Sequence, residues 1–120
     1  MEPIAGYLLL GARLYTEPTR YCEAWNFGPY NDDVLTVKEV VEKALNVWGN
    51  GNYSTPTLEN QPHEAGLLKL DISKTISQLG WKPKFHSLNA IEQTMKWYKH
   101  VTKANASAYT FDQINSYQEL

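Results

Sequence analysis

The sequence predicts an α/β (α+β) fold, a small mixed domain of about four helices and three or four short strands. Segments with helical periodicity alternate along the chain with short apolar runs that end at turn residues. The 120 residues are 42% hydrophobic and carry a net charge of -2. A chain of this size and balance is expected to form a single domain, residues 1–120, around one hydrophobic core.

The first helix is predicted at the amino end. Pro3 suits a first helical turn, and the periodic pattern continues to about Thr16, where Pro18 ends it. The predicted apolar face consists of Ile4, Leu8, Gly11 or Ala12, and Tyr15.

The clearest helix begins at Thr36. Thr36 and Glu39 form a capping box, in which each side chain accepts a hydrogen bond from the other residue's backbone, and Gly49 ends the helix. The apolar face consists of Val37, Val40, Val41, Ala44, Leu45 and Trp48.

The pattern of residues 67–83 predicts a strand followed by a short helix that ends at a glycine. An apolar run ends at residue 70, Ser73 is placed to cap a helix over residues 74–79, and Gly80 ends that helix. Trp81 follows the stop, where its ring either packs on the domain or covers a binding surface, and packing is the favoured interpretation.

The remaining elements are a long helix, two strands and a short tail. Ser87 is expected to cap a helix that runs to about Lys103. Residues 24–27 predict a short buried strand, residues 53–58 an edge strand, and residues 109–120 one or two helical turns. The inward face of the long helix is predicted to carry Leu88, Ile91, Met95, Tyr98 and Val101.

Two catalytic signatures are missing from the sequence. A dinucleotide site needs a glycine-rich turn that opens a helix, whereas Gly49 and Gly51 follow one. No tyrosine has a lysine four residues later, the spacing of a tyrosine–lysine catalytic couple; Tyr98 has Thr102 there. We therefore predict no catalytic and no cofactor-binding residue in this chain.

The polar candidates have competing interpretations. His63 and Glu64 are either a general acid–base pair or, more simply, a hydrogen-bonding turn or a ligand contact. Asp32 and Asp33 are interpreted as turn residues, because neighbours on an extended chain point to opposite faces. One cysteine and three histidines have no metal-ligand spacing, so no metal site is predicted.

Charge and hydropathy limit the partners. The lysines are scattered, which predicts no nucleic-acid partner. No apolar run approaches the roughly 20 residues of a membrane span, which predicts no membrane partner. The amino end has no secretory pattern, so the expected location is the cytoplasm.

Several motifs together resemble one enzyme family. These motifs are WNFGP at 25–29, TVKEVV at 36–41, PHEA at 62–65, and the run LKLDISK with LGWKP between 68 and 83. Together they are similar to the carboxyl third of extended short-chain dehydrogenase/reductases that act on nucleotide sugars. Within that family, the cytidine-linked dehydratases are the most similar.

The resemblance implies a substrate-binding fragment. In this family NAD is the cofactor: it takes a hydride from C4 of the sugar and returns it to C6 after water has left, which gives a 4-keto-6-deoxy product. The dinucleotide-binding domain that carries this chemistry is absent here, so the chain is expected to have no cofactor of its own. The implied substrate-binding residues are His63, Glu64, Asn26 and Tyr30. Asn26 has an alternative role as an amide that satisfies a turn.

Two functions remain open on the sequence alone. The first is the nucleotide-sugar-binding portion of a dehydratase, inactive unless a dinucleotide-binding domain is present in the same chain or a second one. The second is a non-catalytic binding or interaction module derived from a truncated enzyme. In both cases an uncovered apolar surface around Tyr7 and residues 8–10 predicts a homo-oligomer.

Overall fold

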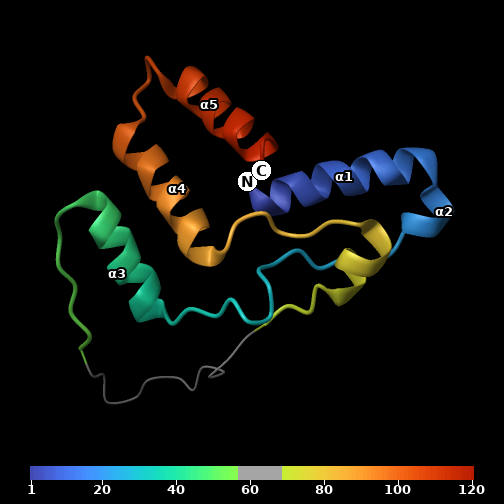
Figure 1. Ribbon diagram of the computed structural model, residues 1–120, viewed down its shortest axis with the longest axis horizontal. Coiled ribbons are helices and arrows are strands. Elements are labelled where there is room, and N and C mark those ends of the chain that lie inside the picture. The colour runs from blue at the N-terminus through green and yellow to red at the C-terminus, as the bar shows by residue number, and fades with distance from the viewer. Residues whose placement is uncertain (57–68) are drawn as a thin grey trace.

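The computed structural model describes residues 1–56 and 69–120, and these residues form helices joined by extended segments (Figure 1). No strand occurs among them, so the predicted α/β class with three or four strands is wrong for the described chain. The segments predicted as strands are not helical where the structure describes them, at residues 24–27, 53–56 and 69–70. No ladder of backbone hydrogen bonds joins these segments. The elements are α1 (Glu2–Thr16), α2 (Pro18–Tyr21), α3 (Val37–Trp48), η1 (Thr75–Leu79), α4 (Ser87–His100) and α5 (Ala106–Gln118).

Helix α1 was predicted correctly in extent, but its buried face was not. The side chains that pack on the core are Leu9, Leu10 and Leu14, whereas the predicted face is exposed. Ile4 is 61% exposed, Leu8 71% and Tyr15 91%. The helix is apolar on two sides, so its periodicity alone did not distinguish the face that packs within this chain.

The core lies between α1, α2 and the segment around η1. Its buried cluster consists of Tyr21, Ile72, Leu79 and Trp81. Trp81 is 5% exposed, which confirms that its ring packs on the domain. Phe27 packs against this cluster, with its ring centroid 5.1 Å from that of Trp81 in an edge-to-face arrangement.

Helix α3 confirms the strongest sequence signal. The Thr36 hydroxyl oxygen accepts a hydrogen bond from the Glu39 amide at 3.2 Å, and the Thr36 amide donates to the Glu39 carboxylate at 2.7 Å. Gly49 then takes the left-handed conformation, with φ 95°, and its amide donates to the Leu45 carbonyl. Both ends of this helix are therefore set by local chemistry.

The short helix after Asp71 differs in detail from the prediction. Residues 75–79 form a π-helix, and Ser73 does not cap it; instead the Ser73 amide donates to the Asp71 carboxylate at 2.8 Å. Hydrogen bonds from Ser73 hold the pKa of the Asp71 carboxyl below its ordinary value. Gly80 ends the helix in the left-handed conformation, as predicted, with φ 78°.

Helices α4 and α5 form an antiparallel pair whose boundaries were partly mispredicted (Figure 1). Helix α4 ends at His100 rather than near residue 103, and Leu88 and Tyr98 on its predicted inward face are exposed. Helix α5 is 13 residues long, where one or two turns were expected. The Trp97 indole N–H donates to the Thr110 hydroxyl at 2.9 Å, a contact that holds the two helices together.

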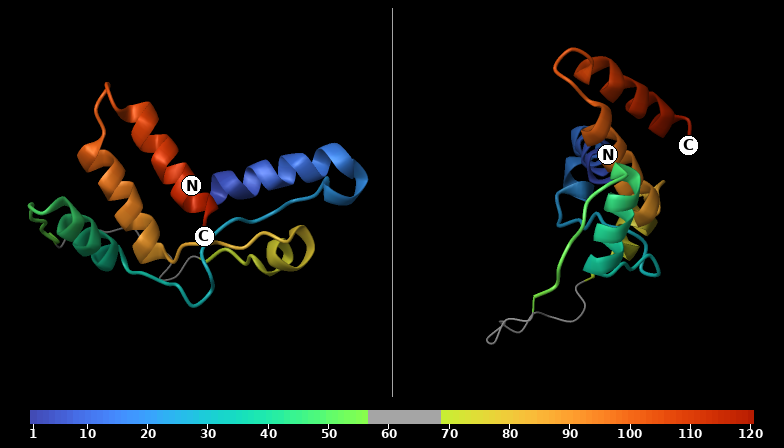
Figure 2. Two further views of the ribbon diagram at one scale, coloured as in Figure 1. Left: turned by 45° about the horizontal axis from the view of Figure 1, so that its top comes forward. Right: turned by 90° about the vertical axis from the view of Figure 1, so that its left-hand side faces the viewer.

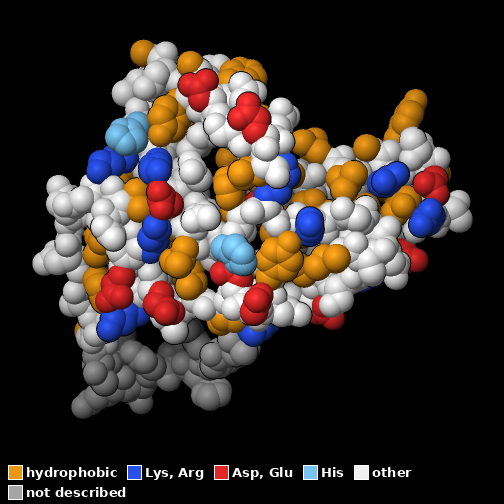
Figure 3. Space-filling view, viewed as in Figure 1, with side chains coloured by type: hydrophobic (Ala, Val, Ile, Leu, Met, Phe, Trp, Pro, Cys, Tyr) orange, Lys and Arg blue, Asp and Glu red, His pale blue; other side chains and the backbone are white. Residues whose placement is uncertain are grey.

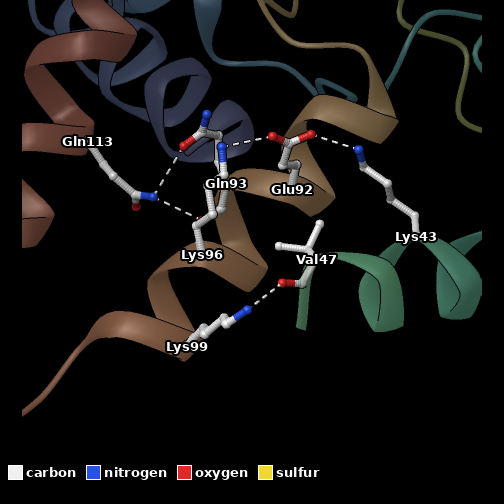
Figure 4. A network of polar contacts seen from close by, with 7 residues as sticks. All are labelled: Lys43, Val47, Glu92, Gln93, Lys96, Lys99 and Gln113. Atoms are coloured by element: carbon white, nitrogen blue, oxygen red, sulfur yellow. Dashed lines mark hydrogen bonds and ion pairs between the residues drawn. The ribbon is translucent and has the colours of Figure 1, made fainter. Parts of the chain in front are cut away.

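A polar network joins α4 to both of its neighbours (Figure 4). The Glu92 carboxylate accepts from Lys43 of α3 at 2.7 Å and from Lys96 at 2.8 Å. On the other side of α4, the Gln113 amide of α5 donates to the Gln93 carbonyl at 2.9 Å. Hydrogen bonds first from Lys43 and then from Lys96 lower the pKa of Glu92 to about 2.

The two ends of the chain meet at Glu2 (Figure 2). Its carboxylate accepts from the amide of Phe85 at 2.8 Å and from the Tyr117 hydroxyl at 2.9 Å. Burial and the bond to Glu2 raise the pKa of the Tyr117 phenol. Through this carboxylate, α1 is joined to the start of α4 and to the end of α5.

The two glycines of α1 predict opposite effects of the same substitution. A Cβ at Gly6 would lie 2.3 Å from the Phe27 ring, whereas a Cβ at Gly11 would meet nothing within 4 Å. We expect Gly6→Ala to destabilise the chain by about 1–3 kcal/mol through overpacking. Gly11→Ala should stabilise it by about 0.5–1 kcal/mol through helix propensity. Urea unfolding measures both, and a Gly6→Ala chain as stable as Gly11→Ala would contradict the described contact.

The lowered pKa of Glu92 predicts a pH-dependent contribution to stability. The contribution is complete above the ordinary value of 4.5 and is lost as the pH falls toward about 2. Glu92→Gln should therefore unfold at lower urea than the unchanged chain at pH 7, and the difference should shrink as the pH falls through that range. Glu119→Gln, at an exposed position near the end of the chain, is the matched control. A constant difference between the Glu92→Gln and unchanged chains across that range would refute the ion-pair account.

Candidate functional site

A cavity of about 550 Å³ lies between α3, the start of α4 and two extended segments. Tyr30, Asp33 and Lys69 supply its aromatic and charged side chains. The apolar part of the lining includes Val34, Leu35, Val40, Leu70 and Ile91. A mostly apolar cavity with a few polar groups at fixed positions has the character of a small-molecule site.

Tyr30 is the predicted site residue that this cavity contains. Its carbonyl accepts from the Asp33 amide at 3.0 Å, which makes a turn directly after Pro29. Its half-buried ring lies beside the His86 ring, with the centroids 5.8 Å apart. The turn and the ring contact together hold the Tyr30 side chain at the cavity wall.

Asp33 is a site residue for which the sequence predicted only a turn role. Its side chain is 9% exposed and accepts from the Ser87 amide at 2.6 Å, so it binds an unpaired N–H at the beginning of α4. The imidazole Nδ1 of His86 lies 3.6 Å from the same carboxylate. Ser87 was predicted to be the cap of this helix, but His86 occupies that position and Asp33 supplies the accepting oxygen.

Lys69 places a positive charge at the cavity. Its ammonium group donates to the Asn31 carbonyl at 2.8 Å, which ties the segment before η1 to the turn that carries Tyr30. The side chain remains exposed.

Asn26 does not line the cavity. Its side-chain amide donates to the Asp71 carbonyl at 3.1 Å, and its own carbonyl accepts from the buried Thr75 hydroxyl at 2.7 Å. These bonds join residues far apart in the sequence. They supply a structural role for Asn26, and its contact with a ligand stays a prediction.

His63 and Glu64 lie outside the described residues, which omit residues 57–68. Their role in substrate binding therefore stays a prediction from the sequence.

Gly49 and Gly51 follow a helix in the structure, whereas the glycine-rich turn of a dinucleotide site opens one. Gly49 and Gly51 have φ angles of 95° and 122° and follow the carboxyl end of α3, where carbonyls rather than amides are exposed. Among residues 1–56 and 69–120, no group of three metal-ligating side chains is close enough to hold an ion. In the same residues, no helix has the length and apolar character required to cross a bilayer.

The chain is similar in sequence to a known enzyme. No protein-family model matches the chain. The chain is 42% identical over 99 residues to CDP-glucose 4,6-dehydratase from Salmonella typhimurium. The match includes 82% of this chain but only 28% of the relative, so the chain corresponds to less than a third of that protein's length. The chain is thus a relative of part of CDP-glucose 4,6-dehydratase, which confirms the resemblance to extended short-chain dehydrogenase/reductases that its motifs predicted.

Proposed function

We propose that this chain is the substrate-binding portion of a nucleotide-sugar dehydratase of the CDP-glucose 4,6-dehydratase type. The observation that carries this proposal is the 42% identity over 99 residues to that enzyme. We further propose that the chain is inactive alone, because it corresponds to 28% of the relative and lacks a tyrosine–lysine couple and a glycine-rich turn that opens a helix. An NAD-binding catalytic part, in the same chain or a second one, would complete the enzyme.

Three features of the cavity beside Tyr30 support this proposal. Its volume of about 550 Å³ is typical of small-molecule sites. The Tyr30 ring offers an aromatic surface on which a pyrimidine base can stack. Lys69 offers a positive charge for a phosphate, and its bond to the Asn31 carbonyl holds the ammonium group near the same wall.

The other candidate contacts extend this proposal. His63 and Glu64 precede Lys69 in the sequence and provide an imidazole and a carboxylate that can hydrogen-bond to sugar hydroxyls. Asn26 is held by Asp71 and Thr75, so its substitution is expected to reduce stability as well as any binding.

The first prediction of this proposal concerns binding by the chain itself. Isothermal calorimetry should detect CDP-glucose binding at millimolar ligand or below. Lys69→Met keeps the length of the side chain but removes the charge, and should weaken binding about two- to fivefold. Tyr30→Leu should weaken it about tenfold through lost stacking. Lys103→Met removes an exposed lysine between α4 and α5 and is the matched control, with no expected effect.

The absence of detectable binding at millimolar CDP-glucose would refute the proposal for the chain on its own. Equal losses in the Lys69→Met and Lys103→Met chains would show that the cavity is not where the phosphate binds.

The second prediction concerns catalysis. The purified chain, mixed with CDP-glucose and NAD, should form no 4-keto sugar above the level of a blank without protein. The absorbance of the 4-keto product in alkali measures this, with the Salmonella typhimurium enzyme as the positive control. Product formation by the chain alone would contradict the proposal that its catalytic part lies elsewhere.

A further inference from the structure

Asp33 has one carboxylate oxygen that the described residues leave without a partner. Its Oδ2 accepts from the Ser87 amide at 2.6 Å and lies 3.6 Å from the His86 imidazole. No described residue donates a hydrogen bond to the other oxygen, Oδ1. The side chain is 9% exposed, so Oδ1 belongs to a carboxylate that is nine-tenths buried. A buried acceptor without a donor is costly, and a donor on a bound ligand would remove that cost.

The Oδ1 atom can be reached from the candidate cavity. Asp33 lines the cavity of about 550 Å³ beside Tyr30. Among the described residues, the fully enclosed side-chain atom without a hydrogen-bond partner is Nε1 of Trp81, so Oδ1 of Asp33 is not sealed off. A ligand in the cavity can therefore supply the missing donor.

The turn at residues 30–33 places this carboxylate beside an aromatic ring. The Tyr30 carbonyl accepts from the Asp33 amide, and a turn of this kind keeps its first and fourth Cα atoms within about 7 Å of each other. The Tyr30 ring and the Asp33 carboxylate thus start from neighbouring points on one cavity wall. A planar base that stacks on the ring can present its edge to the carboxylate.

The charges around the cavity determine which end of a nucleotide sugar can approach Asp33. A carboxylate repels a phosphate group, whereas the Lys69 ammonium group attracts it. Lys69 donates to the Asn31 carbonyl and makes no ion pair with Asp33 in the described part of the chain, so the two charges act separately. The favoured orientation therefore directs the diphosphate toward Lys69 and the base toward Asp33.

The edge of the base decides whether it can satisfy Asp33. An ionised carboxylate accepts hydrogen bonds and donates none. Cytosine carries an amino group at C4, which donates, whereas uracil and thymine carry a carbonyl oxygen there, which accepts. Beside Oδ1, a cytosine gains a charge-assisted hydrogen bond, while a uracil places one acceptor against another. The carboxylate thus favours cytosine over the other two pyrimidines.

We propose that Asp33 is the specificity-determining residue of this cavity, and that its Oδ1 accepts a hydrogen bond from the C4 amino group of a cytosine stacked on Tyr30. This inference rests on the proposed function, because it assigns the selection of the base within that site. Long-range charge cannot make this selection, since CDP-glucose and UDP-glucose carry the same diphosphate. On the face shown in Figure 3, basic and acidic side chains are also interspersed. The two ligands differ only at the edge of the base.

The ratio of two dissociation constants tests this assignment, because a merely structural role of Asp33 would weaken both ligands equally. In calorimetry, the unchanged chain should bind CDP-glucose at least about tenfold more tightly than UDP-glucose, as expected for one hydrogen bond to a charged group. In Asp33→Asn, the amide oxygen can still accept from Ser87 while the amide nitrogen can donate to uracil, so this ratio should fall at least about fivefold. Asp32→Asn, at the exposed neighbouring carboxylate, is the matched control and should keep the ratio.

A series of nucleosides gives the same test without a protein variant. The riboside of pyrimidin-2-one has the ring of cytidine but no amino group at C4, and uridine has a carbonyl oxygen there. In NMR titrations of the unchanged chain, cytidine should shift the Tyr30 ring protons at concentrations at least about tenfold lower than either of the other two nucleosides.

The outcomes separate this inference from the proposed function. Equal affinities of the unchanged chain for CDP-glucose and UDP-glucose overturn the inference, while the proposed function stands. A preference for CDP-glucose that persists in Asp33→Asn, or that is lost equally in Asp32→Asn, also overturns it. If neither nucleotide sugar binds, the proposed function fails and the nucleosides decide: selective shifts with cytidine support the inference, and their absence overturns it. The same nucleoside series decides if circular dichroism shows that Asp33→Asn does not fold.

Discussion

The contact between Phe27 and helix α1 holds the rest of the structure in place. The Phe27 ring lies against Gly6, edge-on to Tyr7 at 5.1 Å and edge-on to Trp81 at 5.1 Å, so it joins the amino-terminal helix to the buried cluster. Because Gly6 has no side chain, the helix can approach the ring closely. The position of α1 in turn places Glu2, whose carboxylate binds the start of the α4 region and the end of α5.

The candidate cavity depends on the same contact through the chain that follows it. Phe27 leads into Pro29 and the turn at Tyr30, and the carboxylate of Asp33 then binds the first amide of α4. This segment runs from the core to the amino end of α4. It bears the Tyr30 ring and the Asp33 carboxylate that caps this helix. Lys69 completes the wall from a distant part of the sequence, through its bond to Asn31. A packing interaction in the core therefore determines where the polar groups of the site lie.

Features with local causes could be predicted from the sequence, and those with distant causes could not. The Thr36 capping box and the helix ends at Gly49 and Gly80 were predicted correctly, because each depends on neighbouring residues. The strands were wrong, because a strand requires a partner backbone and none of the described residues provides one. Helix α5 was predicted too short, because its bonds to Trp97 and Gln93 come from another helix. In the site, the WNFGP motif led to Tyr30, but only the fold shows that Asp33 and Lys69 share its cavity.

The packing of α1 on Phe27 at Gly6 determines the arrangement of the described helices. Proton NMR of the isolated chain tests it most directly, because a proton placed over an aromatic ring is shifted upfield and shows a nuclear Overhauser effect to the ring protons. We expect an upfield-shifted Gly6 α-proton with cross-peaks to the Phe27 ring, and ordinary shifts for the Gly11 α-protons. Ordinary shifts at Gly6, with no cross-peak to Phe27, would contradict it.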